Sequence, residues 1–287
     1  MSTSPSPLVQ RRRLRTELRQ ARLDAGLTQE SVAEEMDWSL SKIIRIETGA
    51  VGVSTNDLTA LLRLYDIDDS QRIKDLVALG KVARQQSWYS KYRGLVPQTY
   101  FQYIEYETSA SVIRSYETML VPGLLQTEEY ASAVMHLHRI HPKREEVRSR
   151  VEIRMKRQQL LLGRASPPPL FFILDEAVIQ RLIGDKATRH DQISRLISIA
   201  NRPDVTIEII PFSVGLHRGM GDNFTILEFS DPSDDDVLYF ESVRDSIFQE
   251  DAEEISIYRE LFEELRKISL GKKKSLDYLV EIADTLT

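Results

Sequence analysis

The stretch GLTQESVAEEMDWSLSKIIRIETG, which runs from Gly26 to Gly49, decides the fold of the first part of the chain. Thr28 predicts the N-cap of a helix over residues 29–36, although Ser31 at the third helical position gives no full capping box. After a turn of three residues, Ser39 predicts the cap of a second helix that ends near Gly49. Two helices joined by so short a turn have helix-turn-helix geometry, in which the second helix enters the major groove of DNA.

Further helices flank this stretch on both sides. Before it, apolar residues recur at helical spacing from Leu14 to Ala25, so the arginines of this segment are expected to lie mostly on the opposite face. Behind it, Ser54 predicts the cap of a helix with an apolar stripe, and another helix is expected over residues 69–84. Residues 1–10, rich in Ser and Pro, are expected to form a disordered arm before a helix-turn-helix domain over residues 11–90.

Length and composition divide the chain into two parts. Its 287 residues suit two domains, and the formal net charge of −6 is unevenly spread, with +3 over residues 1–94 and −9 over residues 95–287. The absence of cysteine excludes a disulfide framework, a thiol nucleophile and any cysteine-ligated metal, and it favours a cytoplasmic location. No run of about 18 uncharged apolar residues is present, so no membrane-spanning helix is expected.

The second part, residues 91–287, changes its periodicity along the chain. Helical patterns cover residues 95–165, strands alternate with loops over residues 168–250, and two helices close the chain over residues 251–287. The fold class is therefore α+β, with an all-α N-terminal domain, a mostly helical region and a small mixed α/β sheet domain. Strands are expected at residues 170–174, 205–210, 224–229 and 237–241, the last three as an antiparallel meander.

Helix geometry selects the side chains of the second motif helix that would meet DNA. Ile43 and Ile46, three residues apart, are expected to face the core, which leaves the residues before and between them on the outer face. Arg45 can bind a guanine edge through two hydrogen bonds. Ile44 can contact a thymine methyl group or, alternatively, a neighbouring helix.

Other residues near the motif are candidates for contacts to phosphate. Lys42 carries a positive charge on the same helix, and Gln29 lies at a helix N-terminus, where backbone amides favour phosphate. The arginine run could follow the DNA backbone, enter the minor groove or form a solvated face. The candidate DNA-binding residues are Thr28, Gln29, Ser39, Leu40, Ser41, Lys42, Ile44, Arg45, Arg11, Arg12 and Arg13. Because one unit reads few base pairs, we expect a homodimer on a near-palindromic operator in double-stranded DNA.

The second part carries weaker signals of a site. Glu176 follows an apolar strand, where a carboxylate is often functional, but Asp175 beside it equally suits the N-cap of a short helix. A ligand or partner site would draw on Glu176, Arg181, His217 and Asp222. No Walker or dinucleotide motif is present, so we expect no enzyme activity, no cofactor and no metal, with a nucleotide-binding or enzymatic domain as an alternative.

The stretch from Gly26 to Gly49 resembles the lambda-repressor-like helix-turn-helix domain of the Xre family. Its family pattern is carried by Thr28-Gln29, Ala33, Ser39 and Ile46-Glu47-Thr48-Gly49. Asp37 departs from the pattern, because a turn glycine is usual there. Asp tolerates the left-handed conformation better than most residues, so we expect the turn to form.

Nearly the whole chain resembles the WhiJ-type Xre regulators of actinobacteria, which carry a large C-terminal domain of uncharacterised function. The matching residues include Val121-Pro122-Gly123-Leu124-Leu125-Gln126-Thr127, Tyr130-Ala131, Leu174-Asp175-Glu176 and Tyr239-Phe240-Glu241, in which Phe240 replaces a usual Val.

This resemblance implies a transcriptional regulator of development whose second domain senses a small protein partner encoded nearby. An acidic second domain would suit a partner with a basic face. We therefore expect a repressor, associated with the nucleoid when it binds DNA, whose partner or ligand changes its affinity for the operator. An antitoxin that neutralises a small cognate toxin by direct binding is the alternative.

Overall fold

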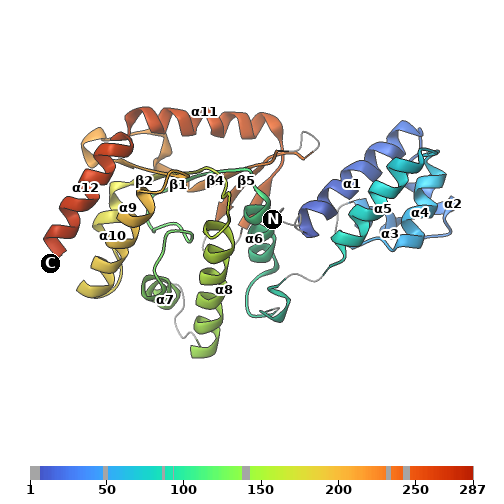
Figure 1. Cartoon of the computed structure of the whole chain (residues 1–287). Coiled ribbons are helices and arrows are strands. Elements are labelled where there is room, and N and C mark those ends of the chain that lie inside the picture. Colours follow the sequence, from blue (N-terminus) through green and yellow to red (C-terminus); the bar gives the residue numbers. More distant parts are fainter. Residues whose placement is uncertain are drawn as a thin grey trace. The chain divides into compact units, whose positions relative to one another are not determined.

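The computed structural model describes residues 7–47, 51–85, 88–92, 94–137, 143–230, 234–241 and 246–286. The chain forms two compact units that divide between Lys91 and Tyr92 (Figure 1). The architecture is α+β, because the first unit is helical and the second is built around a mixed six-stranded sheet.

In its described residues, the first unit consists of helices that share one apolar core. They are α1 (Pro7–Asp24), α2 (Gln29–Glu35), α3 (Leu40–Glu47), α4 (Thr55–Leu64) and α5 (Ser70–Ala83). Side-chain oxygens of Thr28, Ser54 and Asp69 cap the starts of α2, α4 and α5. Each cap satisfies a backbone N–H that the helix itself cannot bond, which explains why local sequence fixes these boundaries.

The start of α1 corrects the predicted disordered arm over residues 1–10. Residues 7–10 belong to the helix. Pro7 stands at its first position, where the missing N–H would have no helical partner and the fixed φ suits the helix. Residues 1–6 lie outside the described residues.

The burial of α1 shows two exceptions to the expectation that its arginines lie mostly on the outer face. Arg12 and Arg22 are buried. α1 packs against both α5 and α3, so the covered stripe is wider than its apolar residues alone indicate.

The second unit has its sheet between layers of helices. The strands are β1 (Val112–Glu117), β2 (Leu170–Asp175), β3 (Val205–Ile210), β4 (Phe224–Glu228), β5 (Val237–Glu241) and β6 (Ser246–Gln249). Their order is β3-β2-β1-β4-β5-β6. β1, β2 and β3 are parallel, and β4, β5 and β6 extend the sheet in antiparallel fashion.

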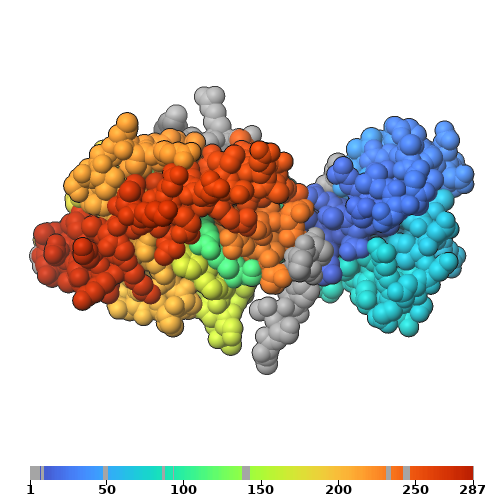
Figure 2. All heavy atoms as spheres, turned by 90° about the horizontal axis from the view of Figure 1, so that it is seen from above, coloured from blue at the N-terminus to red at the C-terminus, as the bar shows by residue number. Residues whose placement is uncertain are grey.

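Helices cover both faces of this sheet (Figure 1). α11 (Ala252–Ile268) runs along one face, and its orange-red atoms spread over that side of the unit in Figure 2. The other face carries α6 (Gln98–Ser109), α7 (Glu128–Leu137) and α8 (Arg144–Leu162). α10 (Lys186–Ala200) and α12 (Gly271–Leu286) pack against each other and β3, and the short α9 (Glu176–Gln180) follows β2.

β1 corrects the predicted helical region over residues 95–165. α6 ends at Ser109, and the residues after it form a central strand. Two polar side chains of β1 have partners on the neighbouring strand β4. Arg114 Nε lies 3.0 Å from Glu228 Oε1 on β4, and the Ser115 and Thr225 hydroxyls share a hydrogen bond of 3.1 Å. Because these partners are far away in sequence, local periodicity does not indicate the strand.

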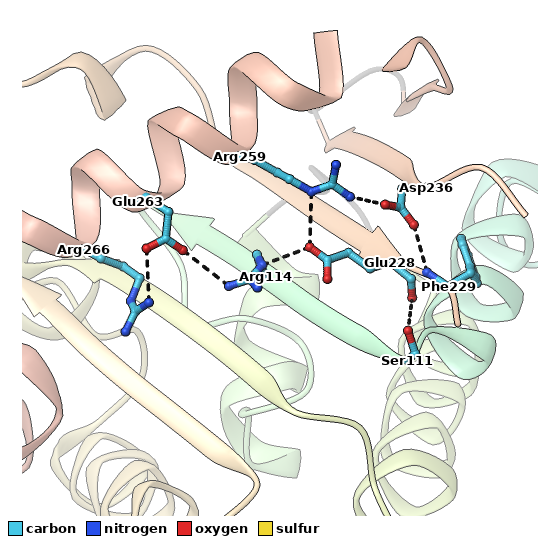
Figure 3. Close-up of polar contacts among 8 residues, drawn as sticks. All are labelled: Ser111, Arg114, Glu228, Phe229, Asp236, Arg259, Glu263 and Arg266. Carbon is cyan, nitrogen blue, oxygen red and sulfur yellow. Dashed lines mark hydrogen bonds and ion pairs between the residues drawn. The ribbon is translucent and has the colours of Figure 1, made fainter. Parts of the chain in front are cut away.

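A polar network also ties α11 to the sheet (Figure 3). Glu263 of α11 lies 3.6 Å from Arg114, and Arg259 of α11 pairs with both Glu228 and Asp236. The network compensates charges that half-burial would otherwise make costly, and it anchors α11 across β1 and β4.

The predicted meander of the last three strands is wrong. β3 lies at a sheet edge beside β2, and β4 pairs with β1 instead. The antiparallel run consists of β4, β5 and β6, of which β6 is not predicted. The chain between β3 and β4 therefore passes two strands, a crossing that strand patterns alone do not indicate.

Candidate nucleic-acid interface

Side-chain caps fix the ends of the two motif helices. Thr28 Oγ1 accepts a hydrogen bond from Ser31 N (3.1 Å), and Ser31 Oγ accepts one from Thr28 N (2.9 Å). This is a complete capping box, so the expectation of an incomplete one is wrong. A serine hydroxyl takes the part usually played by Glu or Gln. Ser39 Oγ accepts a hydrogen bond from Lys42 N (3.3 Å) at the start of α3.

The turn between α2 and α3 is tight. Asp37 has φ of 52°, the left-handed conformation expected at the position of the usual glycine. Trp38 N donates to Ala33 O at 2.9 Å, which holds the turn against α2. The last two residues of the motif, Thr48 and Gly49, lie outside the described residues.

α3 has one buried and one exposed face. Ile43 and Ile46 are buried, as their spacing predicts. The exposed face carries Leu40, Ser41, Ile44 and Arg45. Two of these are large apolar side chains, Leu40 at 37% and Ile44 at 40% exposure. Apolar groups beside an arginine and a hydroxyl suit a surface that meets thymine methyl groups and base edges together.

The two side chains predicted to contact phosphate both have partners within the unit. Lys42 Nζ lies 3.3 Å from Asp57 Oδ2 and 3.3 Å from the centre of the Trp38 ring. Gln29 Nε2 donates a hydrogen bond to Glu47 Oε2 (2.7 Å). Lys42 is 38% exposed and can exchange Asp57 for a phosphate, because an exposed ion pair is worth little. Gln29 instead contributes its side chain to the packing of α2 on α3.

A buried ion pair between Arg22 and Glu47 joins α1 to the end of α3, and sequence reasoning missed it. Arg22 Nε lies 2.7 Å from Glu47 Oε1, and the two side chains are 8% and 5% exposed. Arg22 Nη2 also donates to Glu47 Oε2 (3.1 Å), and Nη1 donates to Leu27 O (2.8 Å). The hydrogen bond to Glu47 raises the pKa of Arg22 above its usual value, although burial opposes this. The signal was available in Glu47, an acid directly beside the buried Ile46.

The arginines at 11–13 differ in their surroundings. Arg11 Nη2 donates to Ala83 O (2.9 Å) in the last turn of α5, where a positive charge also favours the helix dipole. Arg12 is buried, and Arg13 is partly buried. Arg11 and Arg12 thus take part in the packing of the unit.

In the second unit, Glu176 and His217 have separate surroundings. Glu176 Oε2 accepts a hydrogen bond from Phe212 N (2.7 Å), and Oε1 accepts one from the Tyr278 hydroxyl (2.7 Å), which ties α9 to α12. His217 Nε2 instead lies 3.7 Å from Asp175 Oδ2. Asp175 also accepts a hydrogen bond from Ala177 N (2.8 Å), so it is the N-cap of α9.

Arg181 and Asp222 do not complete a pocket with these residues. Arg181 Nη1 lies 4.0 Å from Met119 Sδ, and Asp222 is exposed. Among the described residues, no hydrogen bond or ion pair joins any two of the four candidates. Nor do three His, Asp or Glu side chains of the described part gather to hold a metal, and none of its helices has the length and apolar character to cross a bilayer.

The capped pair of helices, the left-handed turn and the exposed face of α3 define a helix-turn-helix domain, the class of domain that binds DNA in transcription regulators. Residues 13–73 match the family described as a helix-turn-helix domain. Residues 100–281 match the family described as a domain of unknown function (DUF5753). Because this second match covers more than half of the chain, the protein belongs to the DUF5753 family. No curated protein and no solved structure matches the chain.

Proposed function

We propose that the protein is a sequence-specific transcriptional repressor that reads DNA with the exposed face of α3. The observation that supports the proposal is that α3 exposes one face to solvent while a buried ion pair between Glu47, at its end, and Arg22 holds the helix in the core. A helix held in the core loses little conformational freedom when Arg45 meets a guanine. Lys42 and the amides at the start of α2 would add contacts to phosphate.

One recognition helix contacts only a few base pairs, so the proposal includes a homodimer. Two copies on a near-palindromic operator would reach major-groove faces about 34 Å apart. From this role we infer a location in the cytoplasm, and at the nucleoid when the protein is bound to DNA.

The second unit would then sense a signal and carry no enzyme activity. The net charge of −9 over residues 95–287 supports a small protein partner with a basic face. The resemblance to WhiJ-type regulators supports the same role, with the partner encoded nearby. Binding of this partner, or of a ligand, would change operator affinity.

Selection of bound genomic fragments by the full chain tests the proposal. We expect enrichment of a short inverted repeat. Arg45→Ala should weaken binding to that repeat by about 1–3 kcal/mol and leave binding to random DNA unchanged. Arg72→Ala, which removes an exposed arginine of α5, is the matched control and should change neither. Equal losses on both DNAs for Arg45→Ala would contradict base reading by this residue.

Repeating the selection with the product of the adjacent small gene tests the sensor role. Loss of the enriched repeat would support a partner that controls DNA binding. A tight complex that leaves the repeat enriched would favour the antitoxin alternative and contradict control by that partner.

A further inference from the structure

The second unit contains a cavity of about 690 Å³ that none of the sequence-predicted site residues lines. Its walls come from α6, α7, α8, the segment over residues 119–126 and one face of the sheet. This volume lies within the range of small-molecule sites.

The strand registers place a polar row on the floor of the cavity. Ser115 of β1 is opposite Thr225 of β4, which is opposite Tyr239 of β5, so the three side chains share one face. Glu117 and Glu241 lie two residues further along β1 and β5 and therefore share that face too. Both strands run in the same direction because β4 between them is antiparallel to each. The two glutamate backbones are thus about 10 Å apart, two strand spacings, and both side chains line the cavity.

The arginines of the lining already have partners. Arg157 Nε lies 2.7 Å from Glu107 Oε2, and Arg150 Nη2 lies 3.2 Å from Glu146 Oε1. Arg154 Nη1 donates to the Gln126 side chain (2.5 Å). A phosphate group would have to break these contacts, which disfavours an anionic ligand.

Neither of the two glutamates on the floor is neutralised by a positively charged partner within the described residues. Glu117 accepts a hydrogen bond from Ser115 Oγ (3.2 Å), and within the described residues neither Glu117 nor Glu241 forms an ion pair. Burial and the nearby Glu241 carboxylate raise the pKa of Glu117 to about 8, whereas the Ser115 hydrogen bond opposes this. A positive charge between the two carboxylates would relieve their repulsion.

Aromatic rings and a further carboxylate adjoin this floor. The Tyr103 and Tyr239 rings lie 4.2 Å apart between centroids, and both residues line the cavity. Glu107 is fully buried, and although it is ion-paired with Arg157, neither of its oxygens accepts a well-formed hydrogen bond within the described residues. Tyrosine faces and carboxylates together are the surroundings that organic cations prefer.

We propose that this cavity binds a small organic cation, whose protonated amine or guanidinium lies between Glu117 and Glu241 and whose carbon skeleton packs beside Tyr103 and Tyr239. The binding itself needs no DNA; an effect of the ligand on operator affinity rests on the proposed function.

Calorimetric titration of the full chain without DNA tests this inference. The probes are putrescine, L-lysine and glucosamine, which distinguish a polyamine, an amino acid and an amino sugar as the source of the amine. Each is compared with its fully N-acetylated form, in which no amine carries a charge. We expect at least one amine to bind. Its acetylated form should bind at least about tenfold more weakly.

Variants of the two floor glutamates locate the site. Glu117→Gln and Glu241→Gln should each weaken amine binding about tenfold or more. Glu264→Gln, which removes an exposed carboxylate of α11 paired with Arg218, is the matched control and should leave affinity unchanged. Thermal unfolding of each variant shows whether it is folded, and the acetylated probes test the charge requirement without any mutation.

The pH dependence gives a third readout. Glu241 on β5 interacts electrostatically with Glu117 on β1. The Tyr130 hydroxyl on α7 and the Tyr116 hydroxyl on β1 also interact with Glu117. A bound cation favours the ionised carboxylate, so the affinity for putrescine or L-lysine, whose amines stay largely protonated over this range, should rise from pH 6 to pH 8.5 in the wild type and less in Glu117→Gln.

Three results would overturn the inference: no amine binding at millimolar concentration, equal binding of charged and acetylated probes, or binding of inorganic phosphate that both glutamine variants retain. Failure of this titration beside a successful DNA selection would refute the cation site alone. Amine binding beside a failed DNA selection would refute the proposed function alone.

Discussion

Removal of the Glu47 carboxylate should lower the stability of the first unit far more than removal of an exposed carboxylate does. In Glu47→Ala the Arg22 guanidinium keeps its place in the core but loses both contacts to the carboxylate, at 2.7 and 3.1 Å. Its hydrogen bond to Leu27 O remains and does not compensate the charge. Gln29 Nε2 loses its acceptor as well.

The magnitude follows from the burial of the pair. Removing one partner of a buried ion pair costs about 3–5 kcal/mol, because the other charge is left uncompensated. A domain of this size has a free energy of unfolding of about 5–15 kcal/mol, so the variant loses a large part of its stability. The urea midpoint should fall by about 1 M or more. Replacing both residues, as Arg22→Met with Glu47→Leu, should recover most of the loss, because apolar groups of similar volume need no ion pair.

Tryptophan fluorescence measures this unit selectively, since both tryptophans of the chain, Trp38 and Trp88, belong to residues 1–91. Glu34→Ala, on the exposed side of α2, is the control and should change stability by no more than about 0.5 kcal/mol. A loss below about 1 kcal/mol in Glu47→Ala would refute the reasoning, because it would give the pair the strength of an exposed one. So would a double variant less stable than either single variant.

Three further predictions concern packing and titration. Arg11→Ala should destabilise the first unit by about 1.5–3 kcal/mol in urea unfolding, because the hydrogen bond to the Ala83 carbonyl is lost. The dependence of DNA affinity on salt concentration should stay unchanged. A decrease of about 0.9 in the slope of log affinity against log salt would instead make Arg11 a phosphate contact. Gly219→Ala should lower thermal stability by about 1–3 kcal/mol, because a Cβ there would lie 2.8 Å from Leu265 and from the Tyr116 ring, whereas Gly221→Ala meets nothing within 4 Å and should be nearly neutral. Burial and then the Glu47 carboxylate raise the pKa of Tyr65 to about 12, whereas it is about 10 in the unfolded chain. The stability of the wild type relative to Tyr65→Phe should therefore fall as the pH rises from 10 to 12. A constant difference in stability over that window would contradict the shift.

The first unit was largely predictable because its signals are local. Thr28, Ser39 and Ser54 each cap a helix that begins at the next residue, and Asp37 forms its turn from its own backbone. What sequence reasoning missed there depends on contacts between distant segments. The placement of Arg22 in the core is understandable only once α1 lies against the end of α3.

The second unit shows how one sequence rule selects different carboxylates once the strands are known. The rule is that a carboxylate at the end of a buried strand is often functional, and it selected Glu176 because the strand before it is plainly apolar. The same rule applies to Glu117, the last residue of β1, and to Glu241, the last residue of β5. Glu117 was not selected because residues 95–165 were expected to be helical, whereas Arg114 and Ser115 of β1 pair with Glu228 and Thr225 of β4. The error in one strand therefore removed one half of the proposed carboxylate pair, and without it Glu241 had no partner that the sequence could assign.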